Sequence, residues 1–137
     1  MTEILFRGKR TDNGEWVYGY YVCIGKEHHY ICVGKLDITK GYPQFAKFEV
    51  IPETVGQYTG LTDKDGTKIF TGDIVKNDCG DIGIICFGTY ASWSTKHLGF
   101  CINWHNDKLL RRDILYWLNE DKASVIHDNP ELEKERE

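Results

Sequence analysis

The chain has 137 residues, of which 41% are hydrophobic and 13% aromatic, enough for one domain or two very small ones with an ordinary core. The net charge is −4, and five acids against two bases in the segment 128–137 leave the body of the chain nearly neutral, without the overall basicity typical of nucleic-acid-binding domains. No apolar run approaches the ~20 residues of a membrane helix, and the start lacks the order of a signal peptide, so we expect a cytoplasmic protein without a membrane partner.

Two strands are predicted near the N-terminus, over residues 4–9 and 15–24, joined by the polar turn Thr11-Asp12-Asn13-Gly14. In the second strand, large apolar residues occupy every other position, and we expect this face to meet the core: Trp16, Tyr18, Tyr20, Val22 and Ile24. Shorter strands are predicted over 30–33 and 48–51. Between them, 34–47 is predicted to be a loop, because Gly41-Tyr42-Pro43 interrupts any regular element.

The stretch from Pro52 to Val75 is dense in turn signals, above all Asp63-Lys64-Asp65-Gly66 between apolar segments, which predicts a hairpin. Strands are predicted over 70–76, 82–87 and 100–104, with a turn at 77–81. The segment 108–119 is the best helix candidate, since its leucines and isoleucine form an approximate helical stripe. A last strand over 123–127 and a short charged helix over 130–137 complete the prediction.

Three blocks spaced along the chain carry a family resemblance. They are Phe6–Lys9 with Gly14–Gly19, Pro52–Val75 and Ile126–Leu132. With these blocks the chain resembles the YopX-like proteins of bacteriophages and prophages, a family without an established biochemical role. The segments 34–47 and 90–99 lie outside the blocks, so features particular to this chain are expected there.

The resemblance implies a mainly β fold, with an N-terminal antiparallel β unit followed by an SH3-like barrel and one or two short helices. The Gly72-Asp73-Ile74-Val75 string before a glycine-containing turn is typical of such barrels. We therefore expect an N-terminal unit at 1–51, the barrel with its connecting segment at 52–129 and a charged tail at 130–137. The resemblance also implies a phage-derived accessory protein in a bacterial host cell, and it assigns no catalytic residue.

Metal and cofactor sites are not expected. The five cysteines include no Cys-x-x-Cys pair, and an odd number favours reduced, mostly buried thiols. The adjacent His28 and His29 would point to opposite faces of a strand, so at most one could serve a common site. Asp63-x-Asp65-Gly66 resembles the start of a calcium loop but lacks its later ligands.

Two groups of residues could support catalysis, and a structural role is the alternative for each. Cys101 lies four residues from both His97 and His105, a separation of about 13 Å on an extended strand, so a core cysteine is favoured over a nucleophile. A metal-dependent nuclease would gather residues 105–107 with 127–129 around a divalent ion, yet residue types alone do not make such a site. We expect no enzymatic activity, with a histidine-based nuclease or hydrolase as the remaining alternative.

Binding has the stronger support from the sequence. Single-stranded nucleic acid is bound by cations beside aromatic rings, and such residues cluster near the N-terminus: Arg7, Lys9, Arg10, Trp16 and Tyr18. The alternative is that the rings are core and the cations protect a sheet edge. A small unit rich in aromatic residues can also gain burial from a second subunit, or from the rest of its own chain. We therefore expect a non-catalytic, homo-oligomeric binding module whose protein or nucleic-acid partner is unidentified.

Overall fold

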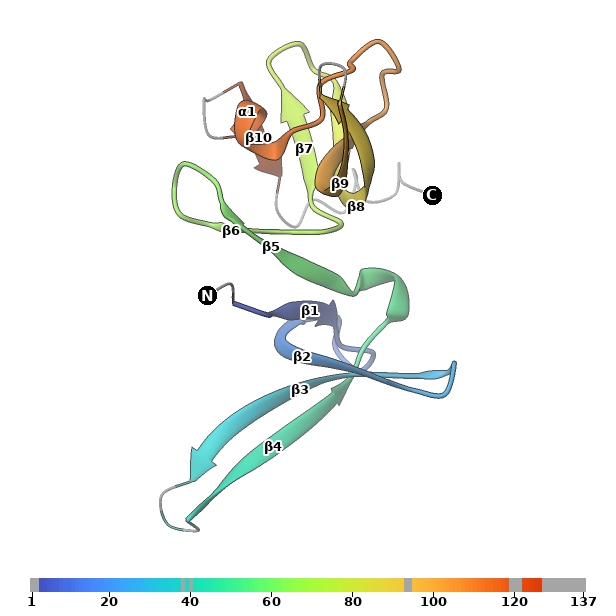
Figure 1. Cartoon of the computed structure of the whole chain (residues 1–137). Coiled ribbons are helices and arrows are strands. Elements are labelled where there is room, and N and C mark those ends of the chain that lie inside the picture. Colours follow the sequence, from blue (N-terminus) through green and yellow to red (C-terminus); the bar gives the residue numbers. More distant parts are fainter. Residues whose placement is uncertain (1–2, 38, 40, 93–94, 119–121, 127–137) are drawn as a thin grey trace. The chain divides into compact units, whose positions relative to one another are not determined.

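The computed structural model describes residues 3–37, 39, 41–92, 95–118 and 122–126 (Figure 1). It is built almost entirely of antiparallel strands, which confirms the predicted mainly β fold class. The chain forms two compact units, Met1–Tyr58 and Thr59–Glu137. No sheet closes on itself within the described residues, so the SH3-like barrel is not confirmed.

The first unit contains four complete strands and a short 3-10 turn. They are β1 (Phe6–Lys9), β2 (Trp16–Ile24), β3 (His28–Asp37), β4 (Tyr42–Glu49) and η1 (Pro52–Thr54). Strand β5 (Gly56–Thr62) begins in this unit, and the strand order is β4-β3-β2-β1-β5. The predicted first hairpin is confirmed, because Arg10 and Glu15 close the turn by a backbone hydrogen bond and Gly14 takes a φ of 72°.

The loop predicted over 34–47 is wrong, because most of this segment lies in strands β3 and β4, which form a hairpin. The Gly41-Tyr42-Pro43 signal marks the turn of that hairpin and the start of its second strand. Proline lacks an N–H to donate, and it is tolerated in β4 because this strand lies at the edge of the sheet.

The core of the first unit lies against one face of its curled sheet. Val50 forms a bridge with Arg10, and Ile51 donates its N–H to the Lys9 carbonyl, so the end of β1 is held against the residues that follow β4. Ile31 and Val50 are thereby almost completely buried. We call the face of β2 and β3 that carries Ile31 the inner face.

The expected orientation of β2 is wrong. Its large alternating residues lie on the face opposite Ile31, and four of them are exposed: Tyr18, Tyr20, Val22 and Ile24. The physical reason is crowding on the inner face. A Cβ at Gly19 would collide with the Cys32 carbonyl oxygen, and one at Gly8 would lie 3.0 Å from the Val50 Cβ. Glycines therefore occupy these crowded inner positions, and the row of large β2 side chains from Tyr18 to Ile24 at every second position lies on the opposite face.

The second unit begins within β5 and continues through the remaining elements. They are β6 (Lys68–Phe70), β7 (Ile74–Asn77), β8 (Ile82–Ser92), β9 (Thr95–Trp104), α1 (Ile114–Leu118) and β10 (Ala123–Ile126). The four last strands form an open sheet of order β10-β7-β8-β9. Its core cluster contains Ile69, Val75, Ile85, Ile102, Trp104, Ile114, Leu118 and Ala123.

Two predicted turns of this unit are confirmed in detail. The Asp63 carboxylate accepts hydrogen bonds from the backbone N–H groups of Asp65 and Thr67, which makes this segment a hairpin turn. The Asn77 side-chain oxygen likewise accepts from Cys79 and Asp81 in the turn between β7 and β8. In both turns a side-chain oxygen, in place of a backbone carbonyl, accepts hydrogen bonds from the backbone N–H groups of the turn.

The helix predicted over 108–119 is mostly wrong, since α1 covers only Ile114–Leu118. The preceding residues lie in extended contact with β9, where Ile102 donates its N–H to the Arg112 carbonyl. The indole N–H groups of Trp104 and Trp117 both donate to the Arg111 carbonyl, at 3.1 and 2.8 Å. These tertiary hydrogen bonds replace those of a longer helix. The predicted tail at 130–137 lies outside the described residues.

Candidate functional site

The most prominent surface feature of the first unit is the outer face of its sheet, opposite Ile31. The exposed fractions of its β2 side chains are 47% for Tyr18, 59% for Tyr20, 39% for Val22 and 55% for Ile24. These residues follow one another at every second position, so their side chains form a continuous apolar row. Isolated exposed apolar residues are normal on a protein surface, whereas a contiguous group marks a site of interaction.

The strand register extends this face across β3 and β4. Tyr20 lies opposite Cys32, which lies opposite Lys47. Val22 lies opposite Tyr30, which in turn pairs with Glu49. Directly opposed residues of antiparallel strands share a face, so these form two rows across the sheet. We define the outer face by Tyr18, Tyr20, Val22, Ile24, Tyr30, Cys32, Phe45, Lys47 and Glu49.

Charged groups border the apolar row. The Lys47 ammonium lies 4.6 Å from the centre of the Tyr30 ring, and Glu49 is exposed two positions along the same strand. Phe45, 65% exposed, continues the apolar surface toward the far end of β4. The outer face thus has an apolar centre, with Lys47 and Glu49 at its β4 side and the cations Arg7 and Lys9 at its β1 side, a composition typical of a protein interface.

The structure brings three of the predicted binding residues together. The guanidinium of Arg7 lies 4.4 Å and the ammonium of Lys9 5.1 Å from the centre of the Trp16 ring. This follows from the register, which places Lys9 opposite Trp16 and Arg7 opposite Tyr18. Arg7 is buried, with 8% of its surface exposed, so it packs as part of the sheet.

Arg10 is separated from this cluster by its own contacts. It forms a bidentate pair with Asp12, with distances of 2.9 and 2.6 Å, and its guanidinium lies 4.5 Å from the centre of the Phe48 ring. The pairing lowers the pKa of the Asp12 carboxyl and raises that of Arg10, because each charge is stabilised by the other. Arg7, Lys9 and Trp16 lie on the same face as Tyr18 by their register, but of the five predicted residues only Tyr18 is exposed.

Most of the outer face was not predicted from the sequence, because the alternation in β2 predicts a core position for Tyr20, Val22 and Ile24. Gly8 and Gly19 could have indicated the crowded face, because they occupy inner positions of neighbouring strands. A period of two shows which residues share a face, but it does not show which face is buried.

The cysteine candidate pairs with a second cysteine. Cys101 lies directly opposite Cys86, and the two Sγ atoms are 3.8 Å apart. Burial, with a smaller contribution from Cys86, raises the pKa of Cys101 to about 11. A nucleophilic cysteine requires a lowered pKa, so this environment favours the neutral thiol of a core residue. His97 instead packs against Tyr90, at 5.4 Å between ring centres.

The candidate nuclease residues lie partly outside the described chain, which ends at Ile126. Within it, the Asn106 side chain donates to Asp81 in the turn between β7 and β8 and accepts from the Lys108 N–H. The described residues contain no group of three or more His, Cys, Asp or Glu side chains arranged to hold a metal ion.

Comparison with known proteins bears on the resemblance carried by the three sequence blocks. The family model described as YopX protein matches residues 5–133, nearly the whole chain. The chain belongs to the YopX family. No curated protein and no solved structure matches it.

The match covers both units and extends into the third block, beyond the described residues. It thus confirms the family proposed from the sequence. Among the described residues of this YopX-family chain, no helix has the length and apolar character needed to cross a bilayer.

Proposed function

We propose that this YopX-family protein is a phage or prophage accessory protein that acts by binding, and that it works as a homo-oligomer. The outer face of the N-terminal sheet is the contact between subunits. The observation that carries this proposal is the exposed row of Tyr18, Tyr20, Val22 and Ile24. Leaving this row in water forgoes a large hydrophobic stabilisation, since burying one such side chain contributes about 1.5–3 kcal/mol.

A second copy of the chain is the partner that the charges on this face favour. A two-fold contact is isologous, so a residue i that meets residue j on the partner is itself met by j from the other side. Lys47 and Glu49 lie two positions apart on β4, and an antiparallel two-fold arrangement can place each Lys47 near the partner's Glu49. The same face thus supplies both members of the ion pair.

The nucleic-acid alternative has weaker geometric support. The cations on which it rests are Arg7, Lys9 and Arg10. Arg7 is buried, Lys9 lies against Trp16, and Arg10 is paired with Asp12. Single-stranded nucleic acid requires cations that can reach phosphates beside accessible rings. This arrangement instead favours cations that hold the sheet together.

Light scattering coupled to size exclusion tests the proposal at micromolar concentration and in two salt concentrations. We expect a mass at least twice 15.9 kDa that persists in high salt and after nuclease treatment, because an apolar contact is little screened. A mass that falls to that of the monomer on nuclease treatment would favour the nucleic-acid alternative instead. A monomeric mass at every concentration would rule out self-association.

A further inference from the structure

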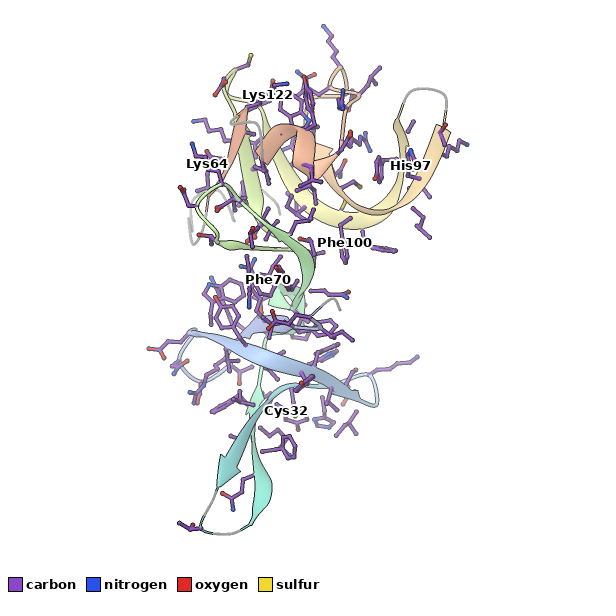
Figure 2. All side chains as sticks on the ribbon, turned by 60° about the vertical axis from the view of Figure 1, so that its left-hand side comes forward. Cys32, Lys64, Phe70, His97, Phe100 and Lys122 are labelled. Atoms are coloured by element: carbon purple, nitrogen blue, oxygen red, sulfur yellow. The ribbon has the colours of Figure 1, made fainter. Side chains whose placement is uncertain are left out.

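Two cysteines of the second unit lie directly opposite one another in the β8–β9 hairpin. Cys86 pairs with Cys101, and their Sγ atoms are 3.8 Å apart. The adjacent pair, Ile85 and Ile102, belongs to the core cluster, and consecutive residues of a strand point to opposite faces. The two thiols therefore share the face that turns away from this cluster. Figure 2 shows the strongly curved hairpin, with His97 toward its far end.

The backbone holds these cysteines at a separation suited to a disulfide. The His105 N–H donates to the Ile82 carbonyl. Hydrogen-bonded pairs occur at every second position of an antiparallel ladder, so Cys86 and Cys101 form such a pair. The Cα atoms of such a pair are about 5.5 Å apart, which is the commonest separation in disulfides. The sulfurs have to approach from 3.8 Å to about 2.0 Å, which rotation of the side chains and a small approach of the strands provide.

The two sulfurs differ in accessibility. Cys101 is 2% exposed, whereas Cys86 is half-buried. Burial also raises the pKa of Cys101 to about 11, so its thiolate, which is the reactive form, is scarce near neutral pH. An oxidant in solution therefore meets Cys86 first, and Cys101 is positioned to attack the product.

The surface next to Cys86 is open to a small molecule. Two residues further on, the same face carries Gly88 opposite Gly99, and a Cβ on either glycine would meet no atom of the described residues within 4 Å. The next pair includes Tyr90, which lines a pocket of about 710 Å³ that residues 110–113 also line. The face beyond the cysteines thus leaves space for a molecule of the size of glutathione.

We propose that Cys86 and Cys101 form a reversible disulfide across the hairpin, with a small-molecule disulfide, such as oxidised glutathione, as the oxidant. The Cys86 thiolate attacks one sulfur of oxidised glutathione, whose S–S bond breaks, and the released glutathione takes up the Cys86 proton. The Cys101 thiol then loses its proton and attacks the Cys86 sulfur, and the second glutathione leaves with that proton. Two thiols are thereby oxidised to one disulfide, and one oxidised glutathione is reduced to two glutathione thiols.

The disulfide closes a loop over residues 87–100 and joins the edge strand β9 covalently to β8. Closing a loop of this length restricts the unfolded chain, so the cross-linked protein should be the more stable form. We expect the Tm of the cross-linked protein to exceed that of the reduced protein by about 5–10 °C.

Peptide mapping after incubation of the full chain with oxidised glutathione tests the proposal. Free thiols are blocked with iodoacetamide, and the protein is digested without reductant. Trypsin cleaves after lysine, which places Cys86 in the peptide 77–96 and Cys101 in the peptide 97–108. Because the first peptide also contains a second cysteine, the experiment uses the Cys79→Ser variant. We expect the two peptides to be joined, with loss of both thiol hydrogens, and to be separated by dithiothreitol.

Two further variants in the Cys79→Ser background establish the order of the steps. With Cys101→Ala, Cys86 should stop at the mixed disulfide with glutathione, and the Tm should not rise on oxidation. With Cys86→Ala, Cys101 should stay reduced, because burial shields it from the oxidant. Thermal melts establish that each variant is folded. The proposal is overturned if folded Cys79→Ser protein keeps both thiols, if its Cys86 is linked only to glutathione or to another chain, or if the cross-linked form melts no higher than the reduced form.

Discussion

At the scale of single residues, Gly19 explains why β2 presents its large side chains outward. Its backbone passes so close to the Cys32 carbonyl that no side chain fits, and Ile31 fills the space beside it. The alternating pattern of β2 is therefore compatible with only one orientation of the strand. The same crowding makes Gly19 a sensitive point for the stability of the first unit.

Gly19→Ala should destabilise the protein by about 1–3 kcal/mol, the usual cost of overpacking, because the new Cβ would displace the β3 backbone. Gly88→Ala is the matched control, since a Cβ there meets no atom within 4 Å. Urea unfolding followed by tryptophan fluorescence measures both variants. Equal stability of the two would contradict the crowding described for the inner face.

Cys101 provides a prediction that depends on pH. Its pKa in the folded protein is raised from 9.0 to about 11 by burial and by Cys86, so the folded state holds this proton more tightly than the unfolded state. The resulting stabilisation is complete below about pH 9 and is lost as the pH rises through about 11. Urea unfolding between pH 8 and about 11 should therefore show that the free energy of unfolding falls more steeply with pH for the parent than for Cys101→Ala.

The same shift predicts slow chemical modification. At pH 8, iodoacetamide should alkylate the exposed Cys23 and Cys79 well before Cys101, because the thiolate is the reactive form. Peptide mapping by mass spectrometry measures this order. Early alkylation of Cys101 in folded protein would contradict both its burial and its raised pKa.

At the scale of elements, the turns were the part of the fold that the sequence could predict. The turns at Gly14, Asp63–Gly66 and Asn77–Asp81 depend on local hydrogen bonds and positive φ angles, which nearby residues determine. The β3–β4 hairpin was not predicted, because Pro43 is typical of a loop and the sequence does not show that its strand lies at the sheet edge. The short α1 was not predicted, because the residues before it contact β9, which is distant in sequence. The contact of Arg112 with Ile102 has no local signature, so the pocket beside it was missed as well.

Gly66→Val and Gly72→Val test this reading of the turns. Both glycines have positive φ angles, 85° and 92°, which a β-branched residue adopts only at a cost of about 1–2 kcal/mol or more. Gly72 also adjoins the buried Asp73, whose carboxylate accepts the Phe70 N–H at 2.8 Å. Thermal melts should show a lower Tm for both variants than for His97→Gln, an exposed control. Melting of both glycine variants at the parental temperature would contradict the turn geometry.

At the scale of the whole molecule, two small units share one chain, and each offers a different surface. The first presents the apolar outer face with Lys47 and Glu49 at its edge, and the second contains a pocket beside Arg111 and Arg112. Both surfaces suit a protein that acts by binding.

The molar mass of outer-face variants tests the central claim most directly. We predict that Tyr20→Ser combined with Val22→Ser lowers the mass measured by light scattering to 15.9 kDa under conditions in which the parent is oligomeric. The control, Phe87→Ser combined with Leu98→Ser, removes two comparably exposed apolar side chains of the second unit and should retain the parental mass. An outer-face variant that is folded and keeps the parental mass would contradict the assignment of this face as the subunit contact.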